Sequence, residues 1–169
     1  MQLTSFILAK NVEFTTLGRF RIHQGGLAHV YFKPPATPLS ALMFSCKALL
    51  ALRAQAAEAG SHRLTFSIRG PGGAIEGSGD ETFQIPAEIG PAGYIPPSPY
   101  PPYHETEVQL VPGSADRQIM RILFINIPIR GEGVSIIEIR VDDALVATAA
   151  MEAHAGEEPK IENSPKKHT

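Results

Sequence analysis

The stretch 117–151 constrains the fold most, because its apolar residues recur at every second position in runs bounded by turn residues. β-branched residues dominate these runs, and Gly-rich and Asp-Asp breaks separate them. That pattern is typical of strands joined by tight turns. The expected strands are 119–129, 134–141 and 144–151. We therefore predict that this stretch forms a three-stranded meander and half of the hydrophobic core.

The chain before this stretch contains further short runs of the same kind. The expected strands are 4–9 with an extension over 12–15 beyond a bulge at 10–11, 18–23, 28–32, 41–53, 62–69, 74–85 with an interruption at 77–80, and 105–111. About nine short strands with frequent turns predict an all-β protein, an antiparallel β-sandwich of the Ig-like or C2-like kind. Closure into a barrel is the alternative.

The segment 41–59 supports two interpretations. Its alanine and leucine content favours a helix, whereas alternate apolar residues in its first half favour a strand. The face that would point into the core holds Leu42, Phe44, Cys46, Ala48, Leu50 and Leu52. We predict a strand over 41–53 followed by one short helical turn at 55–59, with a single amphipathic helix as the alternative.

Length and charge exclude several classes of protein. A chain of 169 residues with a net charge of −2 predicts one domain, without the basic field that nucleic acid requires. Cys46 is the only cysteine, which excludes an intramolecular disulfide and indicates a reducing compartment. The N-terminal residues lack the basic region of a signal peptide, and no apolar run approaches the ~20 residues of a membrane span. We therefore expect a cytoplasmic protein without a membrane span.

Residues 86–103, which we call the Tyr/Pro loop, are dense in proline and tyrosine. Proline cannot supply an N–H to a sheet, so this part of the 1–151 domain should be an extended connection. A stiff polyproline segment loses little entropy on docking, and tyrosine provides contact area. The candidate partner-binding residues are Tyr94, Pro96, Pro97, Pro99, Tyr100, Pro102 and Tyr103. The alternative is that the loop only covers an apolar rim of the sandwich.

The C-terminal residues 152–169 are charged and poor in large apolar side chains, which predicts a disordered tail. The region before them resembles a family of small uncharacterised bacterial proteins. The similar segments are 7–12, Gly25–Gly26, 58–64 and 141–143, within the span 5–151. The resemblance implies a bacterial β-sandwich, and it implies no activity, cofactor or site residue.

Residues suited to catalysis or metal binding form no motif. The six histidines are His23, His29, His62, His104, His154 and His168. No two of them have the spacing of a helical zinc pair, and Cys46 in its apolar run should be a buried, inert thiol. We therefore predict no catalytic, metal or cofactor-binding residue, and no cofactor.

The charged turns and faces also have structural interpretations. Aspartate favours turns by bonding its own backbone, so Asp80–Glu81, Asp116 and Asp142–Asp143 are expected to be turn residues rather than calcium ligands. The outward arginines of two strands are expected to lie on solvated sheet faces. They are Arg19, Arg21, Arg63 and Arg69.

Three hypotheses for the function follow. The first is a non-catalytic module that recognises a protein partner, or a second copy of itself, through an edge strand or the Tyr/Pro loop. The second is a sandwich that binds a small ligand or binds through calcium, which requires a pocket or a cluster of acidic residues. The third is a hydrolase, which requires at least two of His23, His62 and His104 to meet a carboxylate after folding.

Overall fold

The computed structural model describes residues 1–16, 19–34, 42–90, 93 and 105–158, and its strands form two five-stranded sheets. The first sheet has the order β2–β1–β4–β8–β7, with β1 Gln2–Thr16, β2 Arg19–Gly25, β4 Leu42–Ala54, β7 Glu105–Leu110 and β8 Arg117–Ile129. The second has the order β3–β10–β9–β5–β6, with β3 His29–Phe32, β5 Gly60–Arg69, β6 Ile75–Ile85, β9 Gly133–Val141 and β10 Ala144–Ala155. The predicted all-β sandwich is confirmed.

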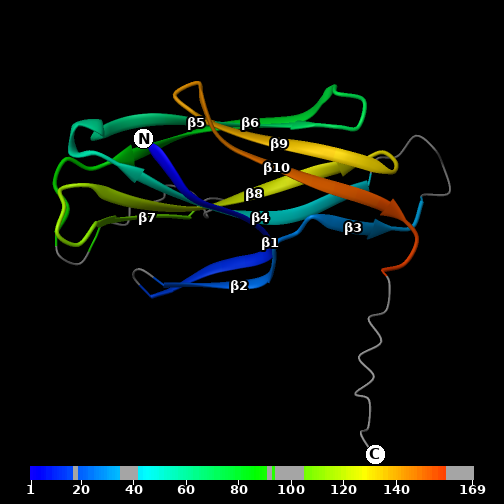
Figure 1. Ribbon diagram of the computed structural model, residues 1–169, viewed down its shortest axis with the longest axis horizontal. Helices are drawn as coiled ribbons and strands as arrows, with labels where there is room; N and C mark the ends of the chain where they lie inside the picture. Colours follow the sequence, from blue (N-terminus) through cyan, green and yellow to red (C-terminus); the bar gives the residue numbers. More distant parts are fainter. Residues whose placement is uncertain (17–18, 35–41, 91–92, 94–104, 159–169) are drawn as a thin grey trace, which may run out of the picture.

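The two sheets are stacked as layers around one core. Figure 1 shows β5, β6, β9 and β10 in one layer and β4, β7 and β8 in the other, with the β1–β2 hairpin projecting from the second layer. Alternate residues of both sheets meet between the layers, as expected for packed sheets. The largest of them are fully buried and include Leu50, Leu52, Leu64, Ile68, Leu123, Ile125 and Ile137.

β4 forms the centre of the first sheet, and it settles the interpretation of 41–59. The strand pairs with β8 over its whole length, from Leu42 opposite Ile129 to Ala54 opposite Arg117. The helical alternative is wrong, because pairing on a sheet buries the alternate residues that a helix would distribute around its axis. Only a short 3-10 turn, Ala56–Glu58, follows β4. No described helix is long and apolar enough to cross a membrane.

The predicted meander is wrong at its first turn. β8 pairs with β4 and β7, whereas β9 pairs with β5 and β10, so the chain crosses between the sheets after β8. The second turn is a hairpin, as predicted, with Val141 opposite Ala144. Asp142 and Asp143 both have positive φ there, 48° and 67°, which a two-residue hairpin turn requires and aspartate tolerates.

Three strands are longer or more continuous than the sequence predicts. β1 continues through Lys10 and Asn11, because it pairs with β4 up to Ala9 and with β2 from Ala9 onward. β6 continues through the glycine-rich stretch 77–80, which stays paired with β5. β10 extends past Met151 to Ala155, because its end pairs in parallel with β3. Residues 152–155 therefore belong to the sheet and not to a tail.

A second, smaller cluster lies on the outward face of β4. Leu49 alternates with core residues yet is buried, because Ala9 and Val12 of β1 and Ile122 of β8 pack against it. Lys47 Nζ, on the same face, donates to the Val12 carbonyl at 2.8 Å. The second half of β1 therefore covers the outer face of the first sheet.

Candidate functional site

The Tyr/Pro loop lies mostly outside the described residues. None of the candidates Tyr94, Pro96, Pro97, Pro99, Tyr100, Pro102 and Tyr103 is described, and neither is His104. Their role in partner binding stays a prediction.

The start of the Tyr/Pro loop is described, and Arg117 holds it. This buried residue of β8 donates from Nε to the Pro86 carbonyl at 3.0 Å and from Nη2 to the Ala87 carbonyl. Its Nη1 donates to the Ala115 carbonyl at 3.1 Å. Three acceptors satisfy a buried guanidinium that would otherwise be costly. Residues 86–87 are thereby tied to the end of the first sheet.

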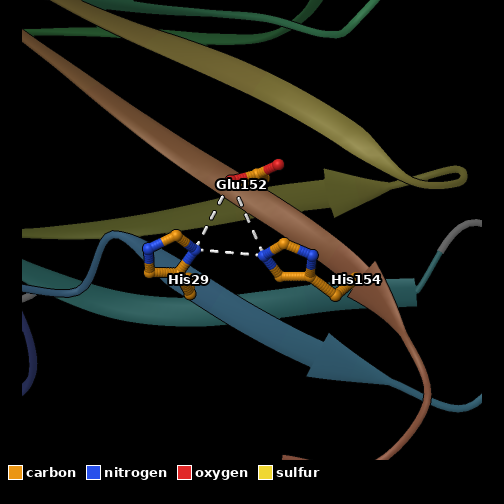
Figure 2. Close-up of side chains that lie close together, drawn as sticks. All are labelled: His29, Glu152 and His154. Atoms are coloured by element: carbon orange, nitrogen blue, oxygen red, sulfur yellow. Dashed lines mark hydrogen bonds and ion pairs between the residues drawn. The ribbon is translucent and has the colours of Figure 1, made fainter.

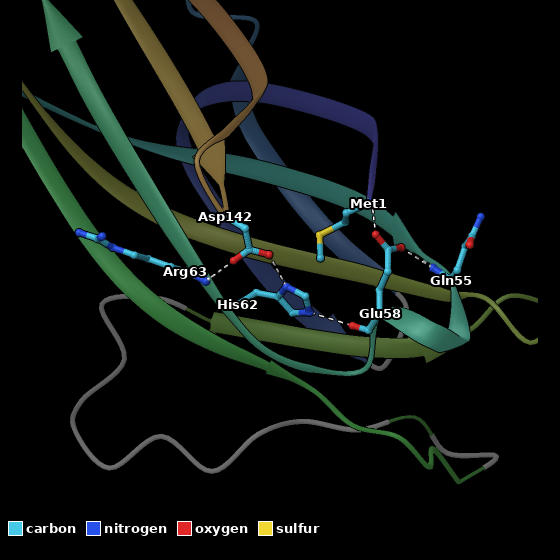
Figure 3. Close-up of polar contacts among 6 residues, drawn as sticks. All are labelled: Met1, Gln55, Glu58, His62, Arg63 and Asp142. Atoms are coloured by element: carbon cyan, nitrogen blue, oxygen red, sulfur yellow. Dashed lines mark hydrogen bonds and ion pairs between the residues drawn. The ribbon is translucent and has the colours of Figure 1, made fainter.

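His62 of β5 is the histidine whose ring contacts a carboxylate most closely, and it has a structural role (Figure 3). Its Nδ1 lies 2.6 Å from Asp142 Oδ2, and its Nε2 lies 2.8 Å from the Glu58 carbonyl. Both partners are hydrogen-bond acceptors, so the ring is held between two different segments of the chain. His23 lies in the other sheet, and its Nε2 is 3.7 Å from Glu13 Oε1, which is too far for a hydrogen bond. The hydrolase hypothesis requires at least two of His23, His62 and His104 within hydrogen-bond reach of a carboxylate, and of the two that are described only His62 meets this condition.

Two carboxylates around His62 are held in their charged forms. The bond to His62, helped by the Arg63 N–H, lowers the pKa of Asp142 below its usual value. The Met1 amino group and the Gln55 N–H likewise lower the pKa of Glu58. These contacts join the chain start, the 3-10 turn and the β9–β10 hairpin.

We expect this network to make stability depend on acid pH. A carboxylate with a lowered folded-state pKa stabilises the fold above its unfolded pKa, about 4, and that stabilisation disappears as the pH falls through the folded value. Asp142→Asn keeps a residue that tolerates positive φ but removes the charge. Urea unfolding should show the variant less stable than the parent at pH 7, and the difference in the free energy of unfolding should shrink as the pH is lowered to 3. A gap of equal size at both pH values would contradict the linkage.

The acidic residues expected in turns do not gather into a calcium site, and Asp80 and Glu81 lie within β6 rather than in a turn. The second hypothesis needs the acidic residues together, but four of them pair with four different basic groups. The ion pairs are Asp80 with Arg63, Glu81 with Arg121, Asp116 with Arg53 and Asp142 with His62. Cys46 is buried, as predicted, and burial raises the pKa of its thiol to about 11, which leaves it unreactive at neutral pH.

An open groove of about 420 Å³ lies on the outer face of the second sheet. Its walls come from β5, β6 and β9, and they include Arg63, Thr65, Phe66, Ser67, Arg69, Ser78, Gly79, Asp80, Glu138 and Arg140. The arginines expected on solvated sheet faces lie on two different sheets. Arg19 and Arg21 belong to β2 in the other sheet, whereas Arg63 and Arg69 share the groove with Arg140 of β9.

Behind the groove, on the core side of the same strands, Gly79 leaves room for an aromatic ring that packs against the main core. Gly79 lies opposite Phe66, and a Cβ on this glycine would be 2.5 Å from the Phe66 ring. The ring therefore fills the place of the missing side chain, an arrangement that supports glycines in edge strands. Replacement of Gly79 would displace the Phe66 ring and disturb the core beneath the groove.

A second polar cluster lies on the outer face of the same sheet, where β3 pairs with β10 (Figure 2). His29 Nδ1 and His154 Nε2 are 3.0 Å apart, and Glu152 Oε2 lies 3.5 Å from the first and 3.7 Å from the second. Tyr31 stacks on His154 with ring centroids 5.0 Å apart. It is the one His/Cys/Asp/Glu group within the described residues whose ligand atoms could share a metal ion.

Sequence reasoning missed this cluster for two reasons. His29 and His154 are 125 residues apart, and only the parallel pairing of β3 with β10 places them side by side. Glu152 and His154 also fell in the segment assigned to the tail. The available signal was that Met151, Ala153 and Ala155 continue the alternation of the last strand.

Comparison with family models, curated proteins and solved structures finds no match for the chain. The described residues form a β-sandwich of ten strands with a charged groove on its outer face.

Proposed function

We propose that the protein is a non-catalytic binding module of the bacterial cytoplasm, which recognises an acidic, extended segment of a protein partner. The segment adds to the edge strand β6 and places its carboxylates in the adjacent groove. The observation that carries this proposal is the set of three arginines around the groove, Arg63, Arg69 and Arg140.

Charge favours an acidic ligand at this face. The groove holds three guanidinium groups and two carboxylates, although the whole chain has a net charge of −2. Arg69 and Arg140 lie 3.9 and 3.8 Å from Glu138, beyond hydrogen-bonding distance. Both therefore keep donors that can bind a ligand carboxylate.

The position of β6 favours an extended ligand. In the described part of the chain β6 pairs with β5 alone, so one side of its backbone has no strand beside it. An added strand would make main-chain hydrogen bonds there, and its side chains would alternate toward and away from the groove. The backbone contacts would contribute affinity and the arginines would select acidic residues.

Binding of synthetic peptides tests the proposal. We would compare two peptides of eleven residues, the length of β6, that alternate valine with glutamate or valine with lysine. The acidic peptide should bind in fluorescence anisotropy, more weakly at high salt, and R63Q/R69Q/R140Q should weaken it about tenfold, because exposed charge contacts contribute up to about 1 kcal/mol each.

R21Q/R53Q/R130Q is the matched control, because it removes the same charge from exposed arginines outside the groove. It should retain binding. Equal binding of both peptides, or equal loss in the two triple variants, would reject the groove as the recognition surface. Concentration-dependent sedimentation of the protein alone would instead show self-association.

A further inference from the structure

We propose that His29, Glu152 and His154 bind a divalent transition-metal ion, with Zn²⁺ as the fitting occupant. This inference goes beyond the proposed function and does not depend on it, because the cluster lies at the β3–β10 end of the second sheet and the groove at its β5–β6 end. Two imidazoles and one carboxylate are a ligand set that suits zinc and related ions, and not calcium or magnesium.

The three ligand atoms have the spacing that such an ion requires. Their separations are 3.0, 3.5 and 3.7 Å. The point equidistant from all three lies about 2.0 Å from each, which matches zinc–nitrogen and zinc–oxygen bond lengths. An ion at or just above this point would lie within bonding distance of all three atoms.

The backbone holds the ligands on one face. Glu152 lies opposite His29 in the register, and His154 lies opposite Tyr31. Ala153 between them points into the core and is buried, so Glu152 and His154 both point outward. Ligands on paired strands are more closely constrained than ligands on loops.

Proton balance also favours an ion. Two imidazole nitrogens 3.0 Å apart can share only one proton, and the Glu152 carboxylate only accepts. Metal binding releases the shared proton to solvent, and each nitrogen and the carboxylate then donates a lone pair to the ion.

The site has room for further ligands. The side chains of His29, Glu152 and His154 are 56%, 46% and 31% exposed, so water can reach the ion. A zinc ion with three protein ligands keeps one open position in its tetrahedral arrangement. Because the ion would join β3 to β10, binding should also raise the melting temperature.

The test is titration of the untagged full chain with Zn²⁺ against a chromophoric chelator, and with Co²⁺ followed by visible absorption. We expect one ion per chain. Loss of a residue that only supports a metal ligand weakens binding roughly 10- to 100-fold. We expect at least this loss from each of the ligand variants His29→Ala, His154→Ala and Glu152→Gln. Zn²⁺ should raise the melting temperature of the parent and of no ligand variant.

His23→Ala is the control, because His23 also lies near a carboxylate, Glu13, but in the other sheet. It should bind Zn²⁺ like the parent. Circular dichroism establishes that the variants fold. If an alanine variant does not fold, Glu152→Gln still tests the site, because glutamine has nearly the same shape as glutamate. Absence of binding by the parent would overturn the proposal, and so would affinity unchanged in all three ligand variants.

Discussion

Replacing Arg121 by methionine should lower the free energy of unfolding by about 3–5 kcal/mol, because it removes one partner of a buried ion pair. Arg121 lies between the sheets, where it contacts Glu81 of β6 and donates to Thr106 Oγ1 of β7 at 2.7 Å. Its guanidinium also lies 4.7 Å from the centre of the Phe83 ring. The variant would leave the Glu81 carboxylate facing an apolar side chain. Urea unfolding at pH 7 measures the loss.

The double variant Arg121→Met/Glu81→Leu should recover most of that stability. Desolvation of two charges offsets much of their attraction, so an apolar pair of similar volume often replaces an ion pair without loss. Arg121 Nε has no acceptor among the described residues, which reduces the benefit of the native pair further. A double variant no more stable than Arg121→Met would show that the pair itself stabilises the sandwich.

Leu50→Ala should cost about 2–5 kcal/mol, because it opens a cavity in the main core. Leu50 is fully buried at the centre of β4, which pairs with β1 and β8. The close-packed neighbours of Leu50 can refill the vacated space only in part.

Met43→Ala is the matched control on the same strand. Met43 is 58% exposed, so its truncation should change the free energy of unfolding by no more than about 0.5 kcal/mol. Urea unfolding of both variants compares them directly. If both variants lost a similar free energy of unfolding, β4 would not have one buried face and one exposed face as the structure shows.

The strands were largely predictable because a period of two is a local property. The alternation in β4 and β5 identified their core faces, and the Asp-Asp turn before β10 was recognised from its residues. Leu49 was assigned to the outward face, where the structure places it. Its burial came from the β1–β2 hairpin, which no local pattern indicates.

The candidate sites depended on pairings that sequence spacing does not encode. Alternation in the sequence places Arg140 on the same side of its strand as Glu138, but only the pairing of β5 with β9 places it beside Arg63 and Arg69. The predicted Tyr/Pro contacts fall in residues that the structure does not describe, so they stay a prediction.

The sequence by itself determined the all-β class, the buried thiol of Cys46 and the inward face of most strands, because burial of alternate residues follows from local pattern. The tertiary structure alone decided that β8 and β9 separate into different sheets and that β3 joins β10 in parallel. Strand partners are chosen by the packing of the whole core, over separations as large as the 125 residues between His29 and His154. That choice brought two histidines and a glutamate to the distances of a metal site.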